Sequence, residues 1–195
     1  MVSAGHTDAT YEQLRAAAEA GLRHATHLYN GMRGLHHREP GTVGGALTLP
    51  GMTVELIADG IHVHPAAMQL AIRARGPANM VAVTDAMRAA GLGEGEFTLG
   101  GLPVIVKDGQ ARLHSGALAG SVLTMDRAVQ NLVRLVGLDL PAAVAMATLN
   151  PARRLGLDHR KGSLAVGKDA DFLILDEHLN VKTTVIGGEV VYDVR

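Results

Sequence analysis

The sequence predicts an α/β protein that forms part of a TIM-like β/α barrel, and three features of the pattern support this fold class. Short apolar stretches alternate with segments of helical periodicity in the first part of the chain. The stretch 80–86 is a continuous apolar run that ends on a carboxylate, Asp85, as expected for a parallel strand buried on both faces. Gly accounts for 24 of the 195 residues, which suits a fold with many tight turns.

The first part of the chain contains about four βα units. Helices are expected from Tyr11 to Ala20, where Thr10 and Gln13 form a capping box, and from Pro65 onward. A closed barrel of this type needs about eight strands, so these units predict one half of a barrel. The connection at 27–45 is expected to be a long functional loop. The strands are expected at 2–5, 22–26, 53–58 and 80–84.

The later part of the chain is expected to be mixed and then all-β. Asp108-Gly109 is a hairpin signal between short strands, and two helices follow, the second beginning near Pro141. We place a partial barrel at 1–157 and the C-terminal strands of a small β-sandwich at 158–195. The strands of this later part are expected at 97–99, 104–107, 111–113, 172–175, 183–186 and 190–192.

Composition limits the classes of partner and site. The formal net charge of -1 gives no reason to expect nucleic acid or a membrane surface as a partner. The absence of cysteine excludes disulfides and thiolate ligands, so any metal must use His and carboxylates. No signal peptide or long apolar run is found, and a cytoplasmic protein is expected. Because a strand is expected at residue 2, the pattern favours the second part of a longer protein.

Polar residues recur at the predicted strand ends, and they predict a metal-assisted hydrolase. His6 and His27 could hold one cation, at about 2.0–2.1 Å if it is zinc. Asp85 could take a proton from water and pass it to a leaving group, and His62 could polarise a carbonyl group. A single His at a strand end is more often a structural residue, but the four together favour a site. Asp59 fits a turn as well as a functional role.

Several motifs resemble the N-acetylglucosamine-6-phosphate deacetylase family. The most specific is Ala-Thr-His-Leu-Tyr-Asn at 25–30. The segment 162–171 resembles a C-terminal signature of the wider amidohydrolase superfamily. Together these motifs cover nearly the whole chain but correspond to the C-terminal half of the family's usual length. The other motifs are at 3–7, 38–41, 57–63, 83–86, 118–125 and 146–152.

The resemblance implies hydrolysis of the N-acetyl group of N-acetylglucosamine 6-phosphate to glucosamine 6-phosphate and acetate. It implies that His6 and His27 bind a divalent cation, with zinc as the first choice and iron, manganese or cobalt as alternatives. Asp85 would be the general base and then the acid. A homodimer is implied for the complete enzyme, with Arg38 reaching the phosphate across its interface. The substrate-binding residues would be Asn30, Gly31, Arg38, His62, Leu118, Ala119 and Gly120.

One family feature is missing from this sequence. The family's first metal ligand is a glutamate in a His-x-Glu-Gly-Pro segment, and no such segment is present. Two alternatives therefore stay open. The chain could be another amidohydrolase, similar to a dihydroorotase or an adenine deaminase. It could also be an inactive fragment that only binds metal or sugar phosphate.

Overall fold

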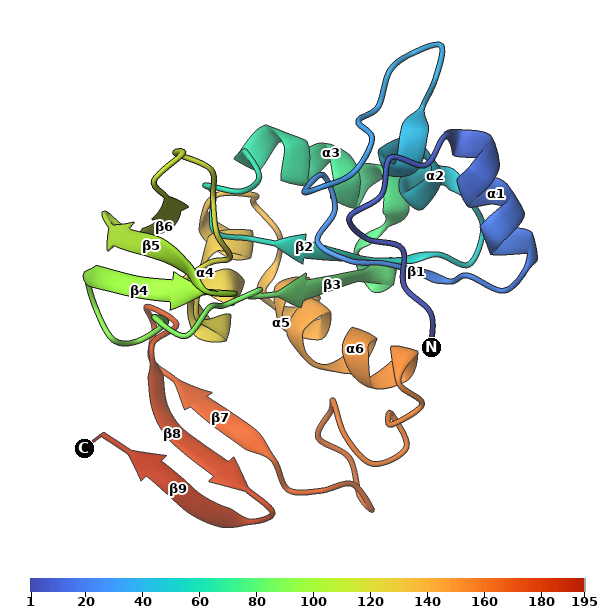
Figure 1. Cartoon of the computed structure of the whole chain (residues 1–195). Helices are drawn as coiled ribbons and strands as arrows, with labels where there is room; N and C mark the ends of the chain where they lie inside the picture. Colours follow the sequence, from blue (N-terminus) through green and yellow to red (C-terminus); the bar gives the residue numbers. More distant parts are fainter. Residues whose placement is uncertain (195) are drawn as a thin grey trace.

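The computed structural model describes residues 1–194, and its barrel part centres on a parallel sheet (Figure 1). The sheet contains β1 (His24–Ala25), β2 (Thr53–Ile57) and β3 (Met80–Val83), hydrogen-bonded in the order β1-β2-β3. Both pairings are parallel, so the carboxyl ends of the strands lie at one edge of the sheet. Three of the four predicted barrel strands are confirmed, although β1 is shorter than expected.

The predicted strand at 2–5 is wrong as a strand. Only Ala4 pairs, in an isolated parallel bridge with Ala25. The amide of Ala4 donates a hydrogen bond of 2.9 Å to the carbonyl of His24, so the segment lies beside β1 in the predicted order. The pairing ends there because residues 1–3 are exposed and β1 offers only a short ladder.

Helices α1 (Tyr11–Glu19) and α3 (Pro65–Arg75) lie where the sequence predicts them. The capping box of α1 is confirmed. The Thr10 side chain accepts from the amide of Gln13, and the Gln13 side chain accepts from the amide of Thr10. These bonds satisfy two amides that the helix itself leaves unpaired. A single 3-10 turn, η1 (Pro77–Asn79), follows α3 and leads into β3.

The loop predicted at 27–45 is too long, because helix α2 (Gly41–Thr48) begins within it. Three of the eight residues of α2 are Gly, each of which disfavours a helix by about 1 kcal/mol relative to Ala. Packing overrides this preference. A Cβ added to Gly45 would lie 2.6 Å from a methyl carbon of Leu14 in α1, so the missing side chain lets the two helices approach closely.

An antiparallel meander follows the parallel sheet. Strands β4 (Gly95–Leu99), β5 (Leu102–Lys107) and β6 (Gln110–Leu113) pair in chain order. Asp108 and Gly109 both have positive φ, 50° and 72°, as in the hairpin turn that the sequence predicts. The meander has a small core of its own, formed by Met87, Ala89, Val104, Val106, Ala111 and Ala119.

Helices α4 (Met125–Arg134), α5 (Leu140–Ala147) and α6 (Leu149–Arg154) pack against β3. The buried side chain of Asn150 donates to the carbonyls of Pro77 and Met80, at 2.8 and 2.7 Å, and so ties α6 to the start of β3. The main core is continuous between the helices and the parallel sheet. Its largest fully buried side chains include Leu28, Leu56, Met68, Met80, Leu132 and Met146.

A third sheet, at the C-terminal end, contains β7 (Phe172–Leu175), β8 (Val181–Ile186) and β9 (Glu189–Asp193). It is antiparallel and lies apart from the parallel sheet (Figure 1). The three predicted C-terminal strands are confirmed, and the domain boundary at 157/158 stays a prediction. None of the helices in the described part of the chain is long and apolar enough to cross a membrane.

Candidate metal and acid–base site

Three predicted polar residues follow the parallel strands at matching positions. His27, Asp59 and Asp85 each come two residues after the last residue of β1, β2 and β3, respectively. In the β2–β3 pairing Ile57 lies opposite Val83, so Asp59 and Asp85 continue the same register. The carboxyl end of a barrel strand is where catalytic residues are found in this type of fold. The residues that the sequence pattern selected after these three strands therefore lie at one edge of the sheet.

Three of the predicted site residues have a left-handed backbone. The φ angles are 45° at His6, 26° at His27 and 48° at Asp85. Residues other than Gly rarely adopt positive φ, and such strain persists only where surrounding contacts hold it. Each of these residues therefore turns sharply out of its strand direction. Asp and His adopt this conformation more often than most residues other than Gly, but the preference is too weak to predict it at these three positions.

The imidazoles of His6 and His27 meet edge to face. Their Nε2 atoms are 3.0 Å apart, and their ring planes are nearly perpendicular at 87°. Two nitrogens that each lie about 2.0–2.1 Å from one cation are about 3 Å apart, so this separation suits a shared ion. Without a cation, the same contact is compatible with an N–H···N hydrogen bond in which one ring donates. The predicted ligand pair is thus brought together.

The donor set is chemically suited to a first-row divalent metal but is limited to this pair. Imidazole nitrogen is a favoured ligand for zinc and iron. Among residues 1–194, no group of three or more His, Cys, Asp or Glu residues is arranged to hold a metal ion. The Nδ1 atom of His27 is buried and has no hydrogen-bond partner within that range. His6 and His27 can therefore supply two of the ligands that a cation needs.

A pocket of about 310 Å³ lies beside His6. Gly31 forms part of its wall, and a Cβ there would lie 2.8 Å from His6 Nδ1, so this position approaches the ring very closely. Arg33, which the sequence analysis did not select, also lines the pocket and donates to Asp8 at 2.7 Å. That bond lowers the pKa of the Asp8 carboxyl. Asn30 donates to the carbonyl of His27 at 3.2 Å, which helps to shape the turn after His27.

His62 is held by Asp59. The Nδ1 atom of His62 lies 2.5 Å from Asp59 Oδ2, and both side chains are buried. Asp59 Oδ1 also accepts from the amides of Ile61 and His62, each at 2.8 Å. Burial raises the pKa of Asp59, but these hydrogen bonds outweigh it, and the net pKa is below the ordinary value. Asp59 is thus both a turn residue and the partner that fixes the ring of His62.

Asp85 lies next to the predicted sugar-pocket segment 118–120. The amide of Ser121 donates to the carbonyl of Asp85 at 2.9 Å, and the hydroxyl of Ser121 donates to the carbonyl of Thr84. A Cβ on Gly120 would lie 3.2 Å from the carbonyl oxygen of Asp85. Leu118 and Ala119 connect this bridge to β6, and the carboxyl of Asp85 is exposed. The structure thus brings together Asp85 and Gly120.

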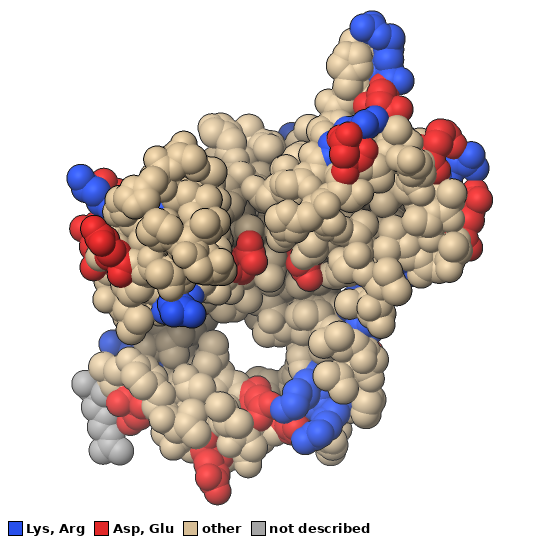
Figure 2. Space-filling view, viewed as in Figure 1, with Lys and Arg blue, Asp and Glu red and all other residues tan. Residues whose placement is uncertain are grey.

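Arg38 is separated from this grouping. It is exposed, and its loop projects away from the body of the chain, where Figure 2 shows basic side chains at the tip. The loop is closed by a bridge between His36 and Glu39, and a nitrogen of Arg38 lies 2.7 Å from His37 Nε2. Arg38 does not line the pocket beside His6.

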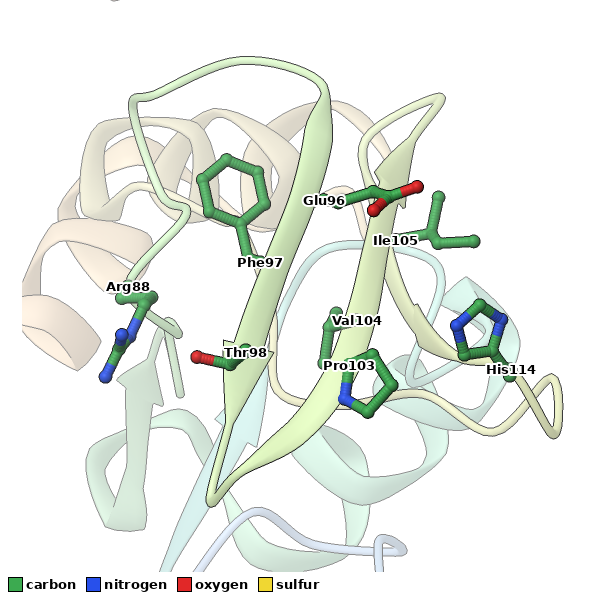
Figure 3. A pocket seen from close by; sticks show the side chains of 8 residues that line it. All are labelled: Arg88, Glu96, Phe97, Thr98, Pro103, Val104, Ile105 and His114. Atoms are coloured by element: carbon green, nitrogen blue, oxygen red, sulfur yellow. The ribbon is translucent and has the colours of Figure 1, made fainter.

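The larger pocket, of about 480 Å³, lies elsewhere, on the β4–β5 face of the meander (Figure 3). Phe97 and Val104 contribute apolar walls, while Arg88 and His114 lie on opposite sides of the two strands. None of the residues predicted for the site lines it. Size alone therefore does not identify the candidate site, which is defined by the strand ends.

Comparisons with known proteins identify the family of the chain. The chain matches the amidohydrolase family over residues 1–191. The N-acetylglucosamine-6-phosphate deacetylase of Vibrio furnissii is 47% identical over 98% of this chain and 48% of its own length. The crystal structure of the Pasteurella multocida enzyme of that name gives a TM-score of 0.95 at 36% identity, covering 99% of this chain and 51% of that one. This chain spans about half the length of these relatives.

A shorter curated relative also exists, in Escherichia coli K12. It is 50% identical over 84% of this chain, and the match covers 98% of the relative. Its name gives N-acetylgalactosamine-6-phosphate deacetylase as a provisional assignment. The predicted resemblance and the predicted fold class, the C-terminal half of a barrel-type α/β protein, are confirmed by these matches. The chain belongs to the amidohydrolase family.

Proposed function

We propose that this chain carries the metal-binding and acid–base half of a deacetylase that acts on N-acetylglucosamine 6-phosphate. The products would be glucosamine 6-phosphate and acetate. The observation that carries the proposal is the contact between His6 and His27, at the sheet edge that also bears Asp85. The names of the relatives support the substrate, a sugar phosphate.

In this mechanism the chain's own residues hold the substrate and move the proton. His6 and His27 would bind a divalent cation, zinc in the first instance, which supplies Lewis-acid polarisation when it is bound. Asp85 accepts a proton from the attacking water as the new C–O bond forms at the acetyl carbon. It then gives that proton to the amide nitrogen as the C–N bond breaks. Acetic acid and an amine are formed, and the acid passes its proton to the amine, so that acetate and an ammonium group leave and Asp85 is again ionised.

The other predicted residues position the substrate. His62, whose Nδ1 is held by Asp59, keeps Nε2 for a hydrogen bond to the oxygen of the scissile amide, where negative charge develops. Asn30 and Gly31 would contact the sugar phosphate, and residues 118–120 would line the sugar pocket. Arg38 would reach a phosphate from the neighbouring copy in a homodimer, because its loop projects outward. We also propose that the protein is cytoplasmic, because that is the compartment of a metabolic sugar phosphate.

A second candidate is a chain that binds metal without turnover. Because no group of three or more His, Cys, Asp or Glu residues in the described part of the chain is arranged to hold a metal, a test must separate turnover from metal binding alone. A cation held by two imidazoles keeps more of its water and binds more weakly than one with a full ligand set. Only the deacetylase is expected to release acetate, whereas both candidates predict that metal binding requires His27.

The test is an assay of acetate release by the purified chain with added zinc. The acetylated substrates are N-acetylglucosamine 6-phosphate and N-acetylgalactosamine 6-phosphate. Dihydroorotate, which has no acetyl group, is assayed separately by the opening of its ring, and bound metal is measured in parallel. Asp85→Asn should lower the rate by at least about 100-fold with metal retained, since general acid–base catalysis contributes roughly that much. His27→Ala should lose metal. Asp126→Asn, at the exposed start of α4, is the matched control and should change neither.

Two results would separate the candidates. Zinc bound through His27, with neither acetate release nor ring opening of dihydroorotate, supports the binding-only reading. Full activity in Asp85→Asn would remove that residue from the chemistry and overturn the proposed mechanism.

A further inference from the structure

We infer that Glu55 is a positioning residue for His27: its carboxylate holds the turn that presents this ligand to the cation. The inference rests on the proposed function only in taking His27 as a metal ligand. Glu55 lies on β2, in the middle of the strand, and its side chain reaches toward the end of β1. The relevant partners are 28 to 31 residues away in sequence.

Both oxygens of the Glu55 carboxylate are used. Oε1 accepts from His24 Nε2 at 2.8 Å, and the His24 side chain is almost fully buried. Oε2 accepts from the hydroxyl of Thr26 at 2.6 Å and from the amide of His27 at 3.4 Å. The backbone carbonyl of Glu55 accepts from the amide of Leu28 at 2.9 Å. One residue of β2 thus contacts four residues of the segment that leads into and out of His27.

The backbone of His27 needs such support. Its φ of 26° is strained for a residue with a side chain, and strain of this kind persists only where neighbouring contacts over-determine it. The imidazole is buried by its neighbours but has only one polar contact in the described part of the chain. Its Nε2 faces His6, and its Nδ1 is buried without a partner in the described part of the chain.

Metal-binding histidines commonly donate their second ring nitrogen to a carboxylate, which fixes the ring. Within residues 1–194 no carboxylate is bonded to that nitrogen of His27, and the Glu55 carboxylate instead holds the backbone that carries the ring. The orientation of the ligand then depends on the Glu55 contacts. If Glu55 were only a structural residue, removing its carboxylate would destabilise the fold but leave the orientation of the His27 ring unchanged.

Glu55→Gln is a sharp test, because it keeps the size and replaces one acceptor oxygen by an NH₂ group. When the remaining oxygen faces His24, the new NH₂ group faces the amide of His27. Two donors then oppose each other, and the hydrogen bond to His27 is lost. Thr26→Val is a milder second variant that removes only the hydroxyl bond to Glu55. Glu12→Gln, on the exposed face of α1, is the matched control.

Two measurements on the full chain test the inference. Nitrogen–proton spectra of the histidine rings, recorded without metal, should show altered His27 and His6 signals in both variants and unaltered signals in the control. Titration with Zn²⁺ against a chelator should show affinity reduced by about 10–100-fold in Glu55→Gln, less in Thr26→Val and not at all in Glu12→Gln. Circular dichroism confirms that each variant is folded.

Unchanged His27 signals and unchanged zinc affinity in folded Glu55→Gln, even with a lower melting temperature, would overturn the inference and make Glu55 a structural residue. Its failure is distinct from a failure of the proposed function. A wild-type chain that releases no acetate counts against the proposed function, while the ring spectra still decide the role of Glu55.

Discussion

At the scale of single residues, the sequence predicted the candidate ligands and the candidate acid–base group, but not the contacts that hold them. His6, His27 and Asp85 were predictable because each follows an apolar stretch at a strand end, a pattern local to the chain. Glu55 was not predictable as a supporting residue. It alternates with apolar neighbours on β2, and its partners come from another strand. Long-range partners of a polar residue leave no mark in the sequence around it.

The pair of Asp59 and His62 gives a pH-dependent prediction. The Asp59 pKa is lowered by its hydrogen bonds despite burial, so the ionised form stabilises the folded state. That contribution is fully present above the unfolded-state pKa of about 3.9 and is lost as pH falls through the lower folded-state pKa. Asp59→Asn should therefore unfold with about 1–3 kcal/mol less free energy near pH 7, and the deficit should shrink below about pH 4.

Urea unfolding of both proteins across that pH range checks this expectation. Glu189→Gln, which removes an exposed carboxylate on β9, serves as the control and should follow the wild type throughout. A deficit for Asp59→Asn that stays constant from neutral to acid pH would contradict a role for the ionised carboxyl.

At the scale of elements, local signals were sufficient where the backbone's own hydrogen bonds decide the structure. The capping box before α1, the Pro at the start of α3 and the hairpin at Asp108-Gly109 were all predictable. Helix α2 was missed because its glycines give it low propensity, and its burial against α1 compensates only in the folded chain. The strand predicted at 2–5 was wrong for the opposite reason. Its apolar pattern favours a strand, but only Ala4 finds a pairing partner, Ala25.

The α1 cap can be tested against an unused cap in the same chain. Thr10→Ala removes the hydroxyl that accepts from the amide of Gln13 and should lower the free energy of unfolding by about 1 kcal/mol. Thr124 occupies the same position before α4, but its side chain makes no capping hydrogen bond. Thr124→Ala should therefore have an effect near zero. Equal losses in the two variants, measured by urea unfolding, would mean that the capping bond is not the cause.

At the scale of the whole molecule, the C-terminal sheet is poorly covered. Neighbouring residues on a strand point to opposite faces of a sheet. Leu173 and Ile174, next to each other on β7, are 53% and 52% exposed, and Val190 and Val191 on β9 are 63% and 56% exposed. Both faces of the β7–β9 sheet therefore carry uncovered apolar side chains. Figure 2 shows an opening between this sheet and the rest of the molecule, so the body of the chain does not close over it.

Exposed apolar surface on this scale favours self-association, because contiguous apolar patches beyond a few hundred Å² are unusual on monomers. We expect the chain to gain mass with concentration over about the micromolar range, as measured by light scattering after size-exclusion chromatography. Replacing Leu173 and Val191 together by Lys should shift it toward the monomer without lowering its melting temperature, since neither side chain is buried. Leu70→Lys is the matched control: this single exposed Leu lies on α3, and its loss should leave association unchanged. A wild-type chain that stays monomeric at all concentrations would contradict the expectation, and association that survives the double substitution would place the contact elsewhere on the molecule.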